Sequence, residues 1–507
     1  MHQALLVCEI LLEIFKHVND IDWQNPIMIS YHEVSLVRTS LAALARTCKT
    51  FYEPAMNELW AKISGLNPLL GCVTRLRPII YCAERTWCNP PYFGDVEPLS
   101  ANEARQFLHH AARVRSIHIE LATNRDFRLL SVLPEETCMF PRLQTLFTAS
   151  LPCPTRYLHL FLSPTLRLCA LWVIDSNLKL IVTRCAALEH LSVKHTDGTI
   201  ADKLPILSDS VRLCKRLVTL SCPPLDWAAW EHLSNLPTLL TVTIRMNNIV
   251  PSPSDLDNIT FGPFLNLTAL SFLADTAAYI TTLVQHSEFP SLKKIDLFFH
   301  RLPCADAERL LHALSQCKAC QTLERIRIKS YSSEVQDPDS SWTAITQLRC
   351  CPQLRTLELE FPGCCTHLDN DHLLEAMSCW PYIRSLELED KNYPQATVTF
   401  RGLLAALRQC PHLDELRMLI DAVNIDVDST AESLRHTSLQ LLHVRSSEVV
   451  DTKAVAHIIF SMLPSVDKIY HSPMNSNHAN TWREVRNHLK HFRSSAVLDS
   501  QDAAAET

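Results

Sequence analysis

A short motif recurs along most of the 507-residue chain, at intervals of 22 to 31 residues. A Cys, Pro or Phe stands just before a Leu-x-x-Leu-x-Leu run, as in CPQLRTLEL at 351–359, WPYIRSLEL at 380–388 and CPHLDELRM at 410–418. In each copy the last two Leu positions alternate with their neighbours at the period of two expected for a strand. Apolar pairs at helical spacing, such as Leu404 and Leu407, lie ahead of the next strand. The period therefore predicts a stack of units that each contain one strand and one helix.

These units have the features of a leucine-rich-repeat solenoid, so the sequence predicts an α/β fold with one strand and one helix per repeat. The alternative is a helical array such as HEAT repeats, but its period is longer, about 40 residues, and it lacks the alternating strand. The cysteines before the strand resemble those of the cysteine-containing and ribonuclease-inhibitor-like repeat subtypes. They are Cys185, Cys214, Cys320, Cys351 and Cys410.

Charged residues occupy the outward positions of several predicted strands. A basic strand is followed by two acidic strands, and together they contain the candidate substrate-binding residues: Arg325, Arg327, Lys329, Glu358, Glu360, Glu387 and Glu389. One interpretation is a charge-patterned surface that selects a protein partner. The other is that these charges solvate the surface or pair with one another.

The composition argues against several functional classes. Only 7 of 507 residues are glycine, against roughly 7% in average proteins, and the sequence contains no G-x-G-x-x-G, G-K-[ST] or G-x-S-x-G motif. We therefore expect no catalytic residues and no cofactor, that is, a protein that is not an enzyme. The net charge of −7 argues against nucleic-acid binding, which usually requires a basic surface.

The cysteines and the N-terminus indicate in which cellular compartment the protein is expected. Because many cysteines occupy apolar positions of the repeat, we interpret them as free thiols. The N-terminal apolar stretch has no preceding basic region and contains Glu9 and Glu13, which is unlike a signal peptide. No apolar run approaches the roughly 18 residues that a membrane helix needs. We therefore expect a reduced protein of the cytoplasm or nucleus, with no membrane partner.

Three cysteine groupings raise the question of a metal site: Cys317 with Cys320, Cys350 with Cys351, and Cys364 with Cys365. A structural zinc site needs four ligands, usually from two such pairs at suitable spacing. Cys320 and Cys351 already have positions in the repeat. The sequence therefore predicts structural cysteines and no metal.

The first sixty residues differ from the repeats. Apolar residues at helical spacing predict an amphipathic helix, namely Leu5, Leu6, Ile10, Leu11, Ile14, Phe15 and Val18. A second apolar helix is predicted from Ser40 to Trp60, broken at Pro54. The polar segment between them, Asn19 to Thr39, is predicted to be a loop.

This segment resembles the F-box, a three-helix module of the form L-P-x-E-I-L-x-x-I-F, then L-x-x-x-x-x-x-C-[RK]-x-[WF], then a closing L-W. The matching residues are Leu6, Glu9, Ile10, Leu11, Ile14 and Phe15, then Leu41, Cys48, Lys49 and Phe51, then Leu59 and Trp60. The order of the segments is most similar to F-box proteins of mushroom-forming fungi, which commonly end in leucine-rich repeats. Val7 replaces the usual proline, and the insertion between the first two helices is longer than usual.

The resemblance implies the substrate-recognition subunit of a Skp1–cullin–F-box ubiquitin ligase. The N-terminal helices would bind Skp1 and, through it, the cullin and RING subunits, while the repeats would bind a protein substrate. The expected adaptor-binding residues are Leu6, Ile10, Leu11, Ile14, Phe15, Leu41, Leu44, Cys48 and Phe51. The alternative is a leucine-rich-repeat scaffold unrelated to ubiquitin, in which these helices only cap the solenoid.

The sequence thus predicts four segments. Residues 1–60 form the F-box-like helical module, 61–105 a connector, 106–471 the solenoid, and 472–507 a terminal helix at 481–492 with a disordered tail.

Overall fold

The computed structural model describes all residues except 1–6, 20–30, 82–95, 120–126, 135–136, 149–154, 175–176, 195–200, 246–260, 333–343, 366, 391–395, 428–434, 472–475 and 506–507. The chain divides into two compact units, residues 1–229 and 230–507. Each unit is an α/β array of repeats.

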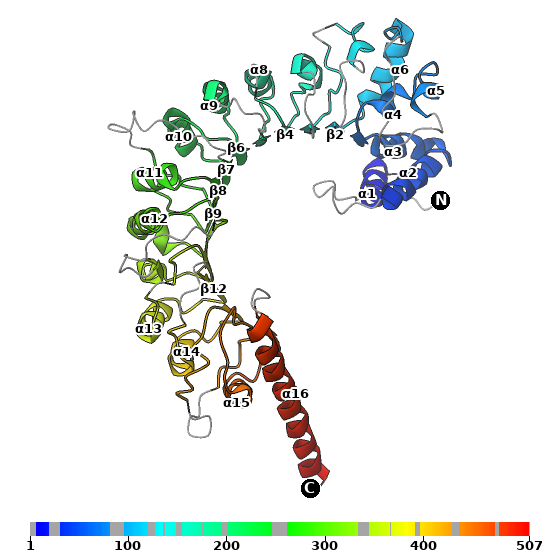
Figure 1. Cartoon of the computed structure of the whole chain (residues 1–507). Helices are drawn as coiled ribbons and strands as arrows, with labels where there is room; N and C mark the ends of the chain where they lie inside the picture. Colours follow the sequence, from blue (N-terminus) through cyan, green and yellow to red (C-terminus); the bar gives the residue numbers. More distant parts are fainter. Residues whose placement is uncertain are drawn as a thin grey trace. The chain divides into compact units, whose positions relative to one another are not determined.

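The first unit begins with helices and continues with repeats (Figure 1). Its helices, 3-10 helices (η) and strands are α1 (Cys8–Val18), α2 (Tyr31–Ala45), α3 (Lys49–Leu59), β1 (Lys62–Ser64), α4 (Asn67–Leu70), α5 (Arg77–Ile80), α6 (Ala101–Ala111), β2 (Ser116–Ile119), β3 (Thr145–Thr148), η3 (Thr155–Phe161), β4 (Leu168–Leu171), α8 (Asn177–Arg184), β5 (His190–Val193), η4 (Ala201–Lys203), α9 (Leu204–Leu213) and β6 (Thr219–Cys222). Strands β1 to β6 pair in parallel, each with the strand that follows it in sequence.

The second unit continues the same arrangement, and α10 (Trp227–Ser234) contains the boundary between the units. Its elements are β7 (Thr241–Arg245), β8 (Ala269–Ala274), α11 (Ala278–His286), β9 (Lys294–Phe299), α12 (Cys304–Gln316), η6 (Lys318–Gln321), β10 (Arg325–Ser330), η7 (Ala344–Leu348), β11 (Thr356–Glu360), α13 (Asn370–Ser378), β12 (Ser385–Glu389), α14 (Phe400–Leu407), β13 (Glu415–Arg417), β14 (Leu441–His443), α15 (Thr452–Met462), β15 (Lys468–Tyr470) and α16 (Ser476–Ala505). The strands again pair in parallel and in order. Helices α11 to α14 lie on one side of the strands (Figure 1).

Neighbouring repeats are joined by a regular backbone ladder just before each strand. The carbonyl of Lys293 accepts hydrogen bonds from the amides of Glu324 and Arg325, at 2.8 and 2.9 Å. The carbonyl of Glu324 likewise accepts from the amides of Arg355 and Thr356, at 2.8 and 3.0 Å. This pattern satisfies backbone groups that a lone strand would leave without partners.

The inward strand positions and the cysteines before the strands form the core. Leu357 and Leu359 of β11 are fully buried, as the alternation predicts. The five cysteines before the strands, from Cys185 to Cys410, are all buried. None of the sixteen cysteines that the structure describes forms a disulfide, so these side chains pack as small apolar groups.

The N-terminal helices differ from the sequence prediction in where they break. Residues 46–48 separate α2 from α3, and Pro54 lies inside α3. The hydroxyl of Thr47 donates to the carbonyl of Leu44 at 2.7 Å, and Cys48 is extended. Pro54 loses its own amide hydrogen bond but remains buried in the helix. Helix α2 begins at Tyr31, so it includes the second half of the predicted loop.

Two other segments also differ from the prediction. Strand β1 lies within the predicted connector and pairs with β2. It has a single buried residue, Ile63, so its sequence contains no alternating pattern from which a repeat could be predicted. Helix α16 extends to Ala505 and includes most of the predicted disordered tail. The side chains of Trp482 and Val485 are fully buried and hold α16 against the repeats. The alanines near the end of α16 have a high helix propensity.

We expect Leu386→Ala to lower the free energy of unfolding of the second unit by about 2–5 kcal/mol, because a buried leucine in a closely packed strand is removed. Leu386 is fully buried in β12, whereas the neighbouring Ser385 is only half-buried. Ser385→Ala should change stability by no more than about 0.5 kcal/mol. Urea denaturation followed by circular dichroism measures both, and equal losses would contradict the assigned faces of β12.

Candidate functional site

Helices α1, α2 and α3 pack around a small apolar core. The buried residues are Leu11, Phe15, Leu41, Ala45 and Ala55, and Val18, Val37, Leu44, Phe51, Met56 and Leu59 pack against them. The rings of Phe15 and Phe51 meet edge to face, with centroids 5.7 Å apart. Such a pair stabilises the contact between α1 and α3 beyond simple burial.

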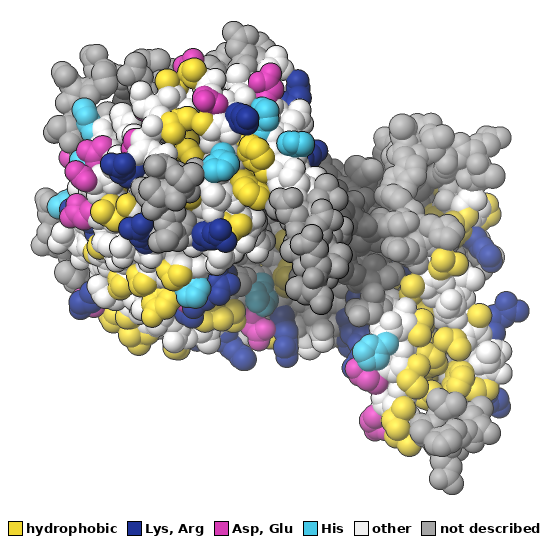
Figure 2. Space-filling view, turned by 90° about the horizontal axis from the view of Figure 1, so that it is seen from below, with side chains coloured by type: hydrophobic (Ala, Val, Ile, Leu, Met, Phe, Trp, Pro, Cys, Tyr) yellow, Lys and Arg dark blue, Asp and Glu magenta, His cyan; other side chains and the backbone are white. Residues whose placement is uncertain are grey.

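The opposite side of α1 leaves apolar side chains in solvent. Ile10 is 41% exposed and Ile14 is 40% exposed, and their i, i+4 spacing places them on one face of the helix. Val7, just before α1, is 42% exposed, and α2 and α3 contribute exposed Leu36 and Tyr52. Figure 2 shows hydrophobic side chains gathered over this helical region, at the lower right. Exposed apolar surface of this kind is typical of a partner-binding site.

The predicted adaptor-binding residues that the structure describes thus fall into three groups by burial. Leu11, Phe15 and Leu41 are buried in the core of the helices. Leu44, Cys48 and Phe51 are half-buried, and Ile10 and Ile14 are exposed, while Leu6 lies outside the described residues. The exposed pair is therefore available to a partner, and the buried three maintain the fold.

A buried carboxylate joins these helices to the first repeats. Glu58 of α3 is 4% exposed and forms an ion pair with Arg115, just before β2. The amide of Asn19, at the end of α1, donates to the backbone carbonyl of Glu58 at 2.9 Å. Arg113 also pairs with Glu53 of α3, at 2.9 Å. These contacts connect α1 and α3 to the strand array of the first unit.

In the second unit, the outward charges of neighbouring strands pair with one another. This network, here named the charge ladder, consists of Asp296, Arg327, Lys329, Glu358, Glu360, Glu387, Glu389, Arg417 and Arg445. The guanidinium of Arg327 donates two hydrogen bonds to the carboxylate of Glu358, both at 2.7 Å. The ammonium of Lys329 lies 3.2 Å from Glu358 and 3.1 Å from Glu360.

Two arginines complete the charge ladder and were missed by sequence reasoning. Arg417 of β13 donates to Glu387 at 2.8 Å, and Arg445 lies 3.2 Å from Glu387 and also pairs with Glu389. Arg445 follows β14 with a left-handed backbone, at φ 54°. Because it lies after the strand, the alternation pattern could not reveal its direction.

The charge ladder alters the pKa values of its members. Burial disfavours the ionised form of Glu358, but the hydrogen bond from Arg327 and the charges of Arg327 and Lys329 outweigh it and lower the pKa of Glu358. The same hydrogen bond raises the pKa of Arg327. The predicted basic and acidic strands therefore neutralise each other. Arg325 lies at the start of β10, beside Lys294 and Thr356 in register.

The strand face of the first unit has a different chemistry. Here the outward strand residues line a hollow of about 560 Å³, named the strand-face hollow. Its lining residues are Lys62, Ile63, Ser116, His118, Phe147, Thr148, Leu168, Ala170, Leu171, Trp172, His190, Leu191, Ser192, Lys194, Thr219 and Ser221. A volume of this size is within the range of ligand-binding sites.

The strand-face hollow combines rings with basic groups. The ammonium of Lys194 lies 5.4 Å from the ring centre of Trp172, and the rings of His118 and Phe147 are 5.9 Å apart. Two lysines and no acidic residue occur among its lining residues. The hydroxyl of Ser221 is buried without a hydrogen-bond partner among the described residues. The hollow therefore suits an anionic group that accompanies an apolar or aromatic one.

Sequence reasoning did not find the strand-face hollow. Its lining residues come from several repeats, in short groups that lie far apart in the sequence, and they are individually unremarkable in type. The available signal was the composition of the outward positions, which are aromatic, His or hydroxyl in β2, β3, β5 and β6, apolar in β4, and mainly charged in β10 to β12.

Within the part of the chain that the structure describes, no helix is both long enough and apolar enough to cross a membrane.

The fold defines an α/β repeat protein whose strand faces are exposed and whose first helices present apolar residues. No protein-family model matches the sequence, and no curated protein matches it. A similar solved structure is "Crystal structure of Rad7 and Elc1 complex in yeast", with a TM-score of 0.31 and 13% identity. The alignment covers 81% of this chain and 93% of that chain.

We expect Glu358→Gln to destabilise the second unit by about 1–3 kcal/mol at pH 7, because a charged hydrogen-bonded partner of Arg327 is lost. Because the pKa of Glu358 is lowered in the folded protein, its contribution to the free energy of unfolding is complete above the ordinary pKa of 4.5. This contribution is lost as the pH falls below 4.5 and through the lowered pKa. The difference between the two proteins should therefore shrink below pH 4.5. Urea denaturation at several pH values measures this. Glu415→Gln is the control, because the Glu415 side chain is 37% exposed and lies 3.9 Å from Arg417, too far for a hydrogen bond. An effect of Glu358→Gln that does not change with pH would contradict the assignment.

Proposed function

We propose that this protein is the substrate-recognition subunit of a Skp1–cullin–F-box ubiquitin ligase. Helices α1 to α3 bind Skp1, which connects the chain to the cullin and RING subunits, and the strand faces bind a protein substrate. The observation that carries the proposal is the apolar surface left exposed on α1 by Ile10 and Ile14. A helical cap serving only to close a solenoid would present a polar outer face.

The burial of the helices supports the F-box resemblance at five of its positions. Leu11, Phe15 and Leu41 match the motif and supply the core, while Ile10 and Ile14 match the motif and remain exposed. A motif residue that the fold does not bury requires another reason for its apolar character, and a bound partner supplies one. Val7 in place of the motif proline leaves α1 without a proline at its start.

The attachment of the helices to the repeats suits the proposed role. Glu58, Arg115 and Asn19 join α1 and α3 to the first strands through buried polar contacts. A ligase subunit without catalytic groups accelerates transfer by holding the substrate at high effective concentration near the charged enzyme. We therefore propose that the chain performs no chemistry itself.

The strand-face hollow is the proposed substrate site. The charge ladder is neutralised by its own members, whereas the hollow offers lysines and rings without acidic lining residues. We propose that it binds an acidic segment of the substrate that also contains an apolar or aromatic side chain. This choice moves the recognition site from the charged strands predicted by sequence to the first unit.

We expect Ile10→Asp together with Ile14→Asp to weaken binding of purified Skp1 by about 2 kcal/mol or more, about thirtyfold in affinity, because two charges would replace an apolar contact. Titration calorimetry with the full chain measures the affinity. Circular dichroism shows whether the fold is retained, as expected for substitutions at exposed sites.

The matched control is Val450→Asp, which places the same charge at a residue 69% exposed in the second unit. It should leave Skp1 binding unchanged. If the native chain does not bind Skp1 at all, the proposal is wrong, and a repeat scaffold unrelated to ubiquitin replaces it.

We expect Trp172→Ala combined with Lys194→Glu to stabilise the substrate in cells, because the hollow loses both a ring and a positive charge. Quantitative proteomics should show the same proteins accumulating, and the same proteins losing ubiquitin, as deletion of the chain, while Skp1 binding is retained. Lys294→Glu, at an exposed position on β9, is the control. Unchanged ubiquitylation in the double variant would locate recognition elsewhere on the chain.

A further inference from the structure

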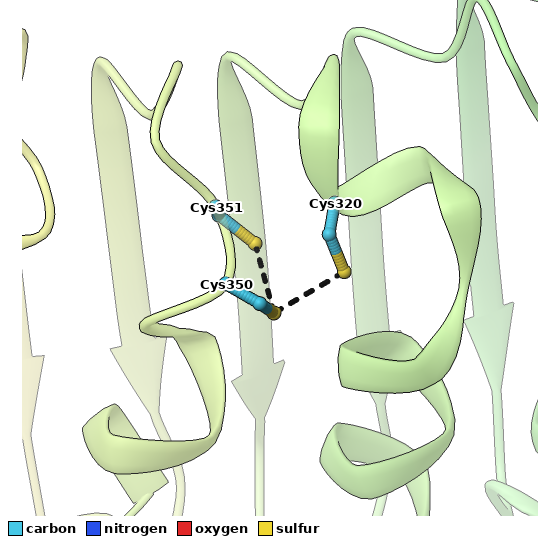
Figure 3. Close-up of side chains that lie close together, drawn as sticks. All are labelled: Cys320, Cys350 and Cys351. Carbon is cyan, nitrogen blue, oxygen red and sulfur yellow. Dashed lines mark hydrogen bonds between the residues drawn. The ribbon is translucent and has the colours of Figure 1, made fainter.

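Three cysteine side chains from two adjacent repeats meet in the second unit (Figure 3). Cys320 lies in η6, and Cys350 and Cys351 follow η7. The sulfur of Cys350 lies 3.3 Å from that of Cys320 and 3.9 Å from that of Cys351. All three sulfurs lie within 4.8 Å of one another. The stacking of the repeats thus creates a cluster that no single motif contains.

The spacing of the sulfurs fits a shared metal ion. A metal–sulfur bond of about 2.3 Å implies sulfur–sulfur distances of about 3.8 Å in a tetrahedral site and about 4.0 Å in a trigonal site. The sulfur of Cys350 lies 3.3 Å from that of Cys320, below both values, and 3.9 Å from that of Cys351, between them. Small rotations about the Cα–Cβ bonds would therefore bring all three sulfurs to bonding distance.

The three cysteines differ in their access to solvent. Cys350 is half-buried, whereas Cys320 and Cys351 are buried. An ion could therefore approach through Cys350, and metal binding would release the protons of the thiols.

We propose that Cys320, Cys350 and Cys351 form a binding site for a thiophilic metal ion, with Cu(I) as the ion it fits best. Three thiolates are soft ligands of the kind that select Cu(I). Zinc prefers four ligands, and the described residues bring no fourth His, Cys, Asp or Glu to this cluster. This site is independent of Skp1 binding and of the strand-face hollow, so neither proposal depends on the other.

The position of Cys350 supports a role beyond packing. Cys320 and Cys351 occupy the buried position before the strand that other repeats fill with a cysteine. Cys350 stands one residue earlier, outside that pattern, and supplies the sulfur that links the other two. Cys364 and Cys365 provide a contrast, since their sulfurs lie 3.6 Å apart but form only a pair.

The test is a competition for Cu(I) between the full chain and a coloured Cu(I) chelator, under anaerobic conditions with a phosphine reductant. The native chain should remove one equivalent of Cu(I) more tightly than Cys350→Ser does. The loss should exceed the roughly 10–100-fold that removal of an outer-shell partner causes, because a direct ligand is lost. X-ray absorption at the copper edge should give a shell of three sulfurs for the native chain.

Cys350→Ser is the informative variant because Cys350 does not fill the core position of a repeat, so the fold should persist. Cys364→Ser is the matched control and should keep the high-affinity site. Cu(I) should raise the melting temperature of the native chain and of Cys364→Ser, but not that of Cys350→Ser. Equal Cu(I) affinity in all three proteins, or a shell of two sulfurs, would overturn the proposal.

Discussion

The structure depends on the hydrogen bonding of its parallel strands. A short strand cannot satisfy its own backbone, and a parallel strand cannot pair with its sequence neighbour through a tight turn. Each strand here pairs with the equivalent strand of the next repeat, and the carbonyl before it accepts two amides from that repeat. Because the same contact recurs in each unit, helices lie on one side of the strands and the outward strand side chains lie on the other. The repeated leucines and cysteines then fill the space between strand and helix.

This backbone arrangement allows one geometry to present different chemistry. In the first unit, the outward positions contain rings, hydroxyls and lysines, which line a hollow. In the second unit, the outward positions contain acids and bases that pair with each other across five strands, β9 to β13, and with Arg445 after β14. Charges that pair within the ladder stabilise the surface and attract a partner less strongly, which is why we propose that the substrate binds on the first unit.

Several features were predictable from the sequence because they depend on local periodicity. The strand and helix of each repeat, the buried Leu357 and Leu359 and the buried position of Cys351 follow from alternation and spacing. The amphipathic character of α1 was visible as well. The break between α2 and α3 was not, since Thr47 and Cys48 interrupt the helix without a glycine or proline, while Pro54 is accommodated. Strand β1 was too short to register as a repeat.

From its residue order alone, this chain specified the repeat, its strand-and-helix unit and an N-terminal segment similar to an F-box, because these depend on residues close together along the backbone. The division of that segment into core and exposed residues required its packed helices, since Ile10 and Leu11 are equally apolar but only Leu11 is buried. The pairing of Arg445 with Glu387 and Glu389, the strand-face hollow and the three-cysteine cluster likewise arose only in the folded protein. Each brings together side chains from different repeats, and their proximity is set by the stacking of strands, which no local pattern encodes.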